Sequence, residues 1–270
     1  MASADVPVHL DIFVSLNLEV MLEGAFDAAG DSMKNELKTG EEDLLDQQYG
    51  YKDPNDLIAL VDREIFGIED NPRMEEGFAV PANAVDVVEI SLREAAAGPD
   101  LALGAKRNDD SVVTRQLAWL LSDGSVTDFK TGTSNGIRFY GQNLGYNKNF
   151  HVVVRHRNHL TIMSKALPVN YTGADINLAD STGNIFGSIN NMSKIGMVYT
   201  VPAGDVDNNQ TIDVHDRNET RTDSQRGEDG YRSSKGLSTD ANLSGRVNAA
   251  DLNLVEKNLP RQLSSVVPNP

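Results

Sequence analysis

The sequence predicts a mainly β fold, an antiparallel β-sandwich over residues 1–202 followed by a small α-helical module over residues 203–270. Three observations support this. Apolar and polar residues alternate strictly in the first segment, short apolar runs separated by turn residues recur up to residue 201, and Asp, Asn, Gly and Ser replace these runs near residue 203. We therefore place a domain boundary at residue 203.

The alternating segment runs from Val6 to Leu22, where every even position is apolar. This period of two is typical of a strand with one buried face. At about 3.3 Å per residue the segment would span roughly 56 Å, far more than a usual strand. Two interpretations remain: two consecutive strands with a bend near Val14 or Ser15, or a strand whose first part, residues 1–14, completes the sheet of a neighbouring molecule.

Charged and turn-forming residues dominate the next segment, residues 28–76, which we interpret as an insertion of loops and short helices. Asp56–Val61 is predicted as a short helix capped by Asn55 or Asp56. Further strands are predicted at Val85–Leu92, Leu117–Leu121, from Val126 onward, Ile137–Tyr140, Val152–Met163 and Ile195–Val201, with a turn at Ser122–Ser125.

The composition excludes several classes of function. A formal charge of −16 argues against nucleic-acid partners, because a phosphate backbone would be repelled. No apolar run is long enough for a membrane-spanning helix. Cysteine is absent, which rules out thiol nucleophiles, thiolate metal sites and disulfides.

Two twelve-residue segments after residue 203 share one arrangement of oxygen-bearing side chains, at positions 1, 3, 5, 9 and 12. Calcium takes six to eight oxygen ligands, and such a loop can supply them together with the backbone carbonyl of position 7. We therefore predict two Ca²⁺ sites. The predicted ligands are Asp205, Asp207, Asn209, Thr211, Asp213 and Asp216 in the first loop, and Asp240, Asn242, Ser244, Arg246, Asn248 and Asp251 in the second.

The two loops match this pattern unequally. The second has Gly245 at position 6, where a sharp turn favours positive φ, whereas the first has Gln210. The second is also followed by a predicted helix with Asn248 as its N-cap and Asp251 three residues later. The sequence therefore identifies the second loop as the firmer site and leaves the geometry of the first in question.

The paired loops resemble the duplicated loop–helix segments of dockerin domains. The upstream residues resemble the β-rich C-terminal regions of secreted bacterial surface proteins, which carry stretches like Val20–Asp27, Val85–Ile90, Asp123–Gly124 and Val152–Leu160. The resemblance implies an extracellular or cell-surface setting. It implies no activity, and pairing with a cohesin partner does not follow from calcium loops alone.

No catalytic motif is recognisable, so the chain is predicted not to be an enzyme and has no expected catalytic residues. His156 and His159 are the only closely spaced histidines. On a strand, residues three apart face opposite sides, so they are poorly placed to share a metal. We interpret Arg155, His156, Arg157 and Asn158 as polar sheet positions or members of an internal hydrogen-bond network.

Together these features favour an extracellular structural protein stabilised by calcium, a surface filament subunit that forms a homopolymer by donating its N-terminal strand. The alternative is a non-catalytic module of the adhesin or dockerin type that binds carbohydrate or a surface protein. Trp119 lies in an apolar strand, which argues against a sugar-stacking platform. Tyr140, Tyr146 and Tyr171 remain candidates for that role.

Overall fold

The structure is a computed structural model that describes residues 13–40, 43–45, 77–95, 112–133, 136–140, 148–168, 173–180, 184–226 and 239–267. Within these residues the protein is mainly β. Its strands are β1 (Phe13–Glu19), β2 (Phe26–Asp27), β3 (Ser32–Met33), β4 (Ala84–Glu94), β5 (Val112–Leu121), β6 (Val126–Asp128), β7 (Ile137–Tyr140), β8 (Asn149–Arg155), β9 (Ile162–Met163), β10 (Leu167–Pro168), β11 (Ala174–Asn177), β12 (Ser193–Ile195) and β13 (Val198–Thr200). Its α-helices are α1 (Glu36–Thr39), α4 (Val214–Arg226) and α5 (Ala249–Asn258).

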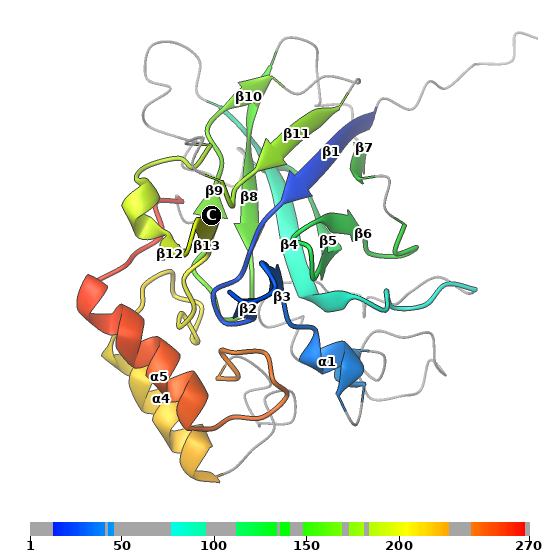
Figure 1. The fold of residues 1–270 in the computed structure, drawn as a ribbon. Helices are drawn as coiled ribbons and strands as arrows, with labels where there is room; N and C mark the ends of the chain where they lie inside the picture. The colour runs from blue at the N-terminus through cyan, green and yellow to red at the C-terminus, as the bar shows by residue number, and fades with distance from the viewer. Residues whose placement is uncertain are drawn as a thin grey trace, which may run out of the picture.

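Two sheets form the centre of the molecule (Figure 1). The larger has the order β10-β8-β4-β5-β6, with β9 paired to β8, and the smaller has the order β11-β1-β7. Neighbouring strands in the larger sheet are antiparallel, as predicted. In the smaller sheet, however, β1 pairs with β11 in parallel. These two strands come from distant parts of the chain, so no hairpin imposes opposite directions on them.

The alternating pattern of the first segment is confirmed where the structure describes it. Val14, Leu16 and Leu18 are buried, while Asn17 between them is exposed. The predicted bend near Val14 or Ser15 is wrong, because β1 is continuous; it pairs with β7 up to Leu16 and with β11 from Leu16 onward. Residues 1–12, which carry most of the proposed donor strand, lie outside the described residues.

The predicted strand Val152–Met163 is two strands. Strand β8 ends at Arg155 and β9 begins at Ile162, and the six residues between them are buried but not extended within the sheet. Four of these residues, His156 to His159, bond through their side chains to Asp86 of β4, to Asp240 or to one another, and the chain turns a corner here instead of continuing the backbone ladder. Ile195–Val201 is likewise a hairpin, with Gly196 at φ +62° in its turn.

One apolar core joins the two sheets. It includes Leu16 and Leu18 from the smaller sheet and Val88 and Ile90 from the larger. Trp119, at the same core, is fully buried, as the sequence analysis expected. Because it is buried, the chain's single tryptophan cannot stack against a sugar ring at the surface.

The insertion is described only at its beginning. There Leu37 of α1 and Leu45 are buried in the core. The predicted helix Asp56–Val61 and the remainder of the insertion lie outside the described residues, as do Tyr146 and Tyr171. Tyr140, the third tyrosine considered, is exposed and lies beside Phe13, with ring centroids 5.9 Å apart.

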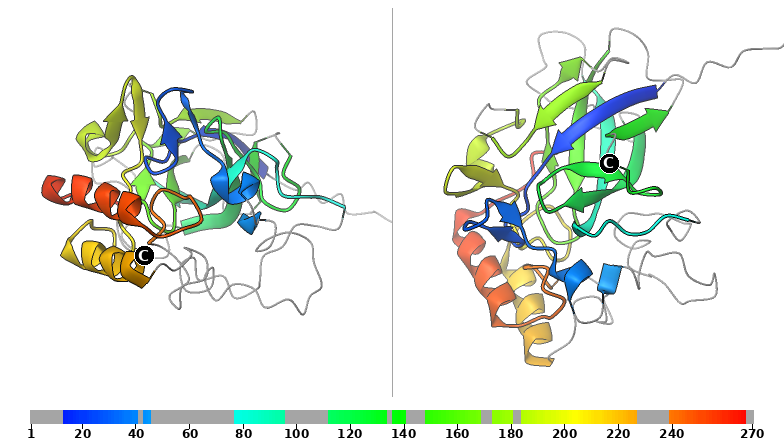
Figure 2. Two further views of the ribbon diagram at one scale, coloured as in Figure 1. Left: turned by 60° about the horizontal axis from the view of Figure 1, so that its bottom comes forward. Right: turned by 45° about the vertical axis from the view of Figure 1, so that its right-hand side comes forward.

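Helices α4 and α5 lie side by side at one end of the sheets (Figures 1 and 2). A small apolar cluster beneath them combines Val206, Ile212, Val255 and Leu263 with Leu160, which belongs to the β-rich part. Packing therefore continues across the boundary placed at residue 203. Of the described helices, none has the length and apolar character that crossing a membrane requires.

Candidate metal centre

The first candidate loop gathers three carboxylates around one point. Asp205 begins the loop, Asp207 follows two residues later, and Asp216 lies in the first turn of α4. One side-chain oxygen from each lies within 4.8 Å of the others. Among the described residues this is the one group of three or more His, Cys, Asp or Glu side chains that comes this close together.

The last carboxylate of each loop is fixed by backbone N–H groups from the same loop. The Asp216 carboxylate accepts from the N–H of Val206 at 2.7 Å and of Asp213 at 2.7 Å. In the second loop the Asp251 carboxylate accepts from the N–H of Asn242 at 3.0 Å and of Asn248 at 2.8 Å. Asp213 and Asn248 both stand at position 9 of their loops, and Val206 and Asn242 stand at the adjacent positions 2 and 3, so the two loops wrap in the same way.

The first carboxylate of each loop is held from position 6. The N–H of Gln210 donates to Asp205 at 3.1 Å, and the N–H of Gly245 donates to Asp240 at 2.8 Å. A further bond, from the N–H of Ser244 to Asp240, is 3.0 Å long. In each loop, backbone N–H groups therefore hold the first and the last carboxylate so that both point toward the centre of the loop.

The turn inside each loop also repeats. Position 4 has φ +57° at both Asn208 and Leu243, and position 6 has φ +72° at Gln210 and +81° at Gly245. Gln210 therefore adopts the left-handed backbone for which the sequence analysis expected glycine. The conformation is costly for a residue with a Cβ, by roughly 1 kcal/mol, but it preserves the loop.

Two substitutions test whether position 6 of each loop favours glycine because of its positive φ. We expect Gln210→Gly to raise the free energy of unfolding by about 1 kcal/mol, because glycine accepts positive φ without strain. Gly245→Ala should lower it, because the new Cβ would be strained at φ +81° and would lie 2.9 Å from Cδ1 of Leu44. Urea denaturation of both variants measures the two effects, and shifts of the same sign would contradict the account.

The remaining predicted ligands occupy the expected positions around the loops. The Asn209 side chain accepts from the N–H of Thr211 at 2.9 Å, and the Ser244 hydroxyl donates to the carbonyl of Arg246 at 3.2 Å. Asp213 lies outside the group of three carboxylates and accepts from the N–H of His215 at 2.6 Å. Position 9 of calcium loops often binds through water, which fits this placement.

The carboxylates sit in an environment that opposes their charge unless a cation is bound. Burial, together with the neighbouring carboxylates of Asp216 and Asp207, raises the pKa of Asp205 to about 8. Burial likewise raises the pKa of Asp216 to about 6 and that of Asp240 to about 7. A divalent cation among these oxygens would supply the missing countercharge.

The two loops differ in charge. The first offers the carboxylates of Asp205, Asp207, Asp213 and Asp216, whereas the second offers two carboxylates and fills its other side-chain positions with Asn242, Ser244 and Asn248. Calcium affinity rises with the number of charged ligands. On this ground we expect the first loop to bind the ion more tightly, which reverses the order suggested by Gly245 alone.

A buried polar network lies next to the second loop. His156 Nε2 lies 3.0 Å from the Asp86 carboxylate, and Arg157 donates to the same carboxylate at 2.7 Å. Burial raises the pKa of Asp86, but Arg157 and His156 together hold it well below its usual range. The neighbouring Asn158 donates from its side chain to the carbonyl of Asp240 at 2.8 Å, so the network supports the loop directly.

Both histidines belong to this network, which confirms one of the two roles predicted for His156 and corrects the geometry predicted for the pair. They do not lie on a strand facing opposite sides. Their Nδ1 atoms are 3.1 Å apart, because the corner after β8 folds His159 back onto His156. His159 Nε2 accepts the N–H of Gly24 at 3.1 Å.

Glu23 and Gly24 lie on the opposite side of this network, where Gly24 contacts both His159 and the second loop. No sequence motif for a metal site includes these two residues. A Cβ on Gly24 would lie 1.8 Å from the carbonyl oxygen of Ala241 in the second loop. The buried Glu23 carboxylate accepts from the N–H of Ala203 at 3.1 Å and from the side chain of Asn258 at 2.6 Å. The only signal for them in the sequence is that a Glu-Gly pair follows the apolar alternation ending at Leu22.

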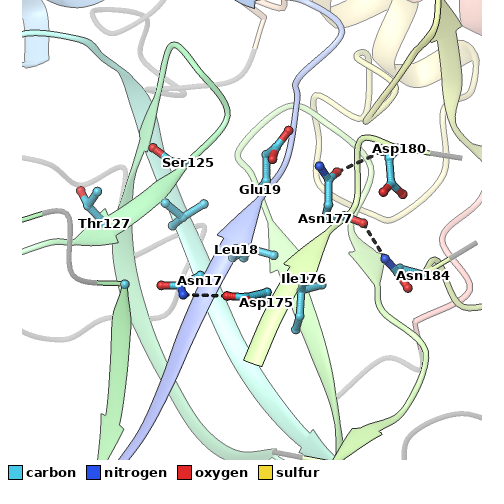
Figure 3. A pocket seen from close by; sticks show the side chains of 12 residues that line it. Asn17, Leu18, Glu19, Ser125, Thr127, Asp175, Ile176, Asn177, Asp180 and Asn184 are labelled. Carbon is cyan, nitrogen blue, oxygen red and sulfur yellow. Dashed lines mark hydrogen bonds between the residues drawn. The ribbon is translucent and has the colours of Figure 1, made fainter. Parts of the chain in front are cut away.

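A separate cleft of about 590 Å³ lies on the outer side of the smaller sheet (Figure 3). Its polar side chains bond to one another and to nearby backbone: Asn17 donates to Asp175 at 2.7 Å, and Asn177 accepts the N–H of Asp180 at 3.0 Å. Glu19, Asp175 and Asp180 line it but do not form a metal-ligating group by the criterion that Asp205, Asp207 and Asp216 meet.

Comparison with known proteins adds no relative. No protein-family model matches the chain, and no curated protein is similar to it. The candidate site therefore rests on its own geometry.

Proposed function

We propose that the two loops bind two Ca²⁺ ions and that the protein is an extracellular structural protein stabilised by them. One observation carries the proposal: two segments 35 residues apart build the same oxygen-lined cage, with matching positive-φ positions and matching backbone bonds to the first and last carboxylate. Repeated geometry of this kind is expected of a metal loop and is not needed for an acidic surface turn.

The residues fit calcium better than other common metals. Every ligand offered is an oxygen, from carboxylates, carboxamides, a hydroxyl and carbonyls, and no histidine or cysteine is among them. Hard cations such as calcium prefer this set, whereas zinc and copper prefer nitrogen and sulfur ligands. The twelve-residue spacing and the following helices support the likeness to dockerin modules.

The role proposed for calcium is to stabilise the fold. Leu243 of the second loop belongs to the apolar core of the sheets, and Leu44 lies against Gly245. A loop that is built into the core of a β-sandwich stabilises that core when its ion is bound. This attachment favours a structural role over the alternative of a docking module that engages a separate protein through the loops.

The calcium sites are tested by counting bound ions. Native mass spectrometry of the full chain should show two Ca²⁺, with Asp216→Asn and Asp251→Asn each losing one and Asp175→Asn, in the outer cleft, losing none. Asparagine keeps the shape of aspartate while removing its charge, so the variants isolate the ligand role. A chain that binds no calcium, or variants that keep both ions, would refute the proposal.

We extend the proposal to assembly: the protein is a filament subunit at the bacterial cell surface, and its N-terminal segment adds a strand to the next protomer. The support is the alternation from Val6, which continues into the buried even positions of β1. Strand addition satisfies an open sheet edge with main-chain hydrogen bonds. Head-to-tail contacts of this kind give open polymers.

Deletion of residues 1–12 tests the assembly without touching β1, which begins at Phe13. In calcium, negative-stain electron microscopy should show filaments of the full chain and single particles of the truncated one. Single particles for both chains, or filaments for both, would overturn strand donation. Neither result would affect the calcium sites.

A further inference from the structure

A second cavity, of about 290 Å³, lies on the larger sheet away from the metal loops. Its floor is formed by Glu89 of β4 with Arg115 and Leu117 of β5, and its wall by Asp128 at the end of β6 and by Phe129 and Lys130 after it. The volume is at the lower end of the roughly 300–1,000 Å³ of small-molecule sites. It suits a ligand of one small ring rather than an extended chain.

Glu89 projects from the sheet on the side of this cavity. It lies opposite Leu117 in the β4–β5 ladder, and residues directly opposite in an antiparallel pair share one face. Its side chain is buried, with the residue 8% exposed, and Oε2 has no hydrogen-bond partner among the described residues. Buried carboxylate oxygens are almost always bonded, so this atom calls for a donor that the described residues do not supply.

The wall of the cavity is rigid. Trp119 donates from Nε1 to the carbonyl of Phe129 at 2.8 Å, and the two rings stack with centroids 5.1 Å apart. Asp128 is held by the N–H of Thr131 at 2.9 Å. A site fixed in this way by packed and bonded residues is preorganised for a ligand.

The charges around Glu89 indicate which chemical group of a ligand could donate a hydrogen bond to its Oε2. Burial raises the pKa of Glu89, while the guanidinium groups of Arg155, Arg115 and Arg93 oppose that shift. A ligand ammonium would be repelled by these three cations, so the missing donor is a neutral hydroxyl. A hydroxyl can donate to Glu89 and accept from the cationic side chains of Arg115 or Lys130 at the same time.

We propose that this cavity binds a neutral polyhydroxylated molecule of monosaccharide size, with Glu89 as its buried acceptor. The lining supports this: two acidic and two basic side chains balance one another, and Leu117 and Phe129 offer apolar surface to the C–H groups of a sugar ring. The outer cleft is the weaker candidate for a sugar, because its amides and carboxylates already bond to one another (Figure 3).

The proposal does not depend on the calcium loops, and its test separates the two. Saturation-transfer-difference NMR on the full chain in calcium would use D-galactose, D-mannose and N-acetyl-D-glucosamine as probes, with L-alanine as a small zwitterion that carries an ammonium group. We expect at least one sugar to bind and alanine not to bind. Glu89→Gln should weaken that sugar by roughly tenfold, because it removes one charge-assisted hydrogen bond.

Two controls locate the binding. Glu94→Gln, at the end of the same strand and paired with Lys148, should leave affinity unchanged, as should Asp175→Asn in the outer cleft. Lys130→Met alters the wall at an exposed residue, and it should also weaken binding, which keeps the test decisive if Glu89→Gln fails to fold. Binding of alanine, binding of no sugar (a water molecule alone serving Glu89), or sugar binding indifferent to both Glu89 and Lys130 would overturn the proposal.

Discussion

Replacing Gly24 by alanine should lower the free energy of unfolding by about 3 kcal/mol. The new Cβ would lie 1.8 Å from the carbonyl oxygen of Ala241, so either the strand end or the second loop must move. Movement would also strain two bonds at this contact, from the N–H of Gly24 to His159 and from Asn158 to the carbonyl of Asp240. Urea denaturation in calcium measures the loss.

Gly24→Ala should also change calcium binding, and at only one of the two proposed sites. Because Ala241 belongs to the second loop, we expect Gly24→Ala to weaken one of the two Ca²⁺ sites and leave the first unchanged in titration calorimetry. Gly30→Ala is the matched control: its Cβ would meet only the flexible hydroxyl of Ser32, at 3.1 Å. A similar loss of stability for both variants would show that the cost arises from the backbone of glycine and not from the contact.

The local features of the candidate site were predictable from the sequence, because a metal loop takes nearly all its ligands from twelve consecutive residues. The capping box of Asn248 and Asp251 was predictable for the same reason and is present in α5. The alternation in β1 identified its buried face, since one face of a strand is set by consecutive residues.

What could not be predicted depends on contacts between distant residues. The parallel pairing of β1 with β11 joins Leu16 to Ala174, and no periodicity within either segment records the direction of its partner. Gly24 could be recognised as glycine but not as the point at which Ala241 approaches. The strand prediction failed at His156–His159 because the backbone ladder with β4 stops at Arg155 and these polar side chains bond instead to the side chain of Asp86, to the carbonyl of Asp240 and to the N–H of Gly24.

This buried histidine pair should make the fold sensitive to acid. His159 Nε2 accepts from Gly24, so its proton is on Nδ1, which lies 2.6 Å from the side-chain oxygen of Asn158. His156 Nε2 faces the Asp86 carboxylate and carries its proton there, which leaves its Nδ1 to accept from His159 at 3.1 Å. Both rings are therefore neutral, and a second proton on either would face another donor.

The sign of the effect follows from the pKa shifts. Burial lowers the pKa of His156 and lowers that of His159 well below its ordinary value. Below about pH 6.5 the unfolded chain binds protons at these residues, while the folded chain does not. The free energy of unfolding is therefore unaffected by the pair above pH 6.5 and falls as the pH drops below it. The slope is at most about 1.4 kcal/mol per pH unit for each histidine, so protonation of the pair lowers the free energy of unfolding by at most about 3 kcal/mol at pH 5.5.

The measurement compares the full chain with a His156→Gln/His159→Gln variant by urea denaturation at pH 8 and pH 5.5 in the same calcium concentration. The difference at pH 8 gives the cost of lost packing and bonds. The smaller pH dependence of the variant gives the contribution of protonation, and the acidic groups, including those with raised pKa in the metal loops, cancel because both proteins contain them. If the two proteins lose the same stability between these pH values, the pair is not what makes the fold sensitive to acid.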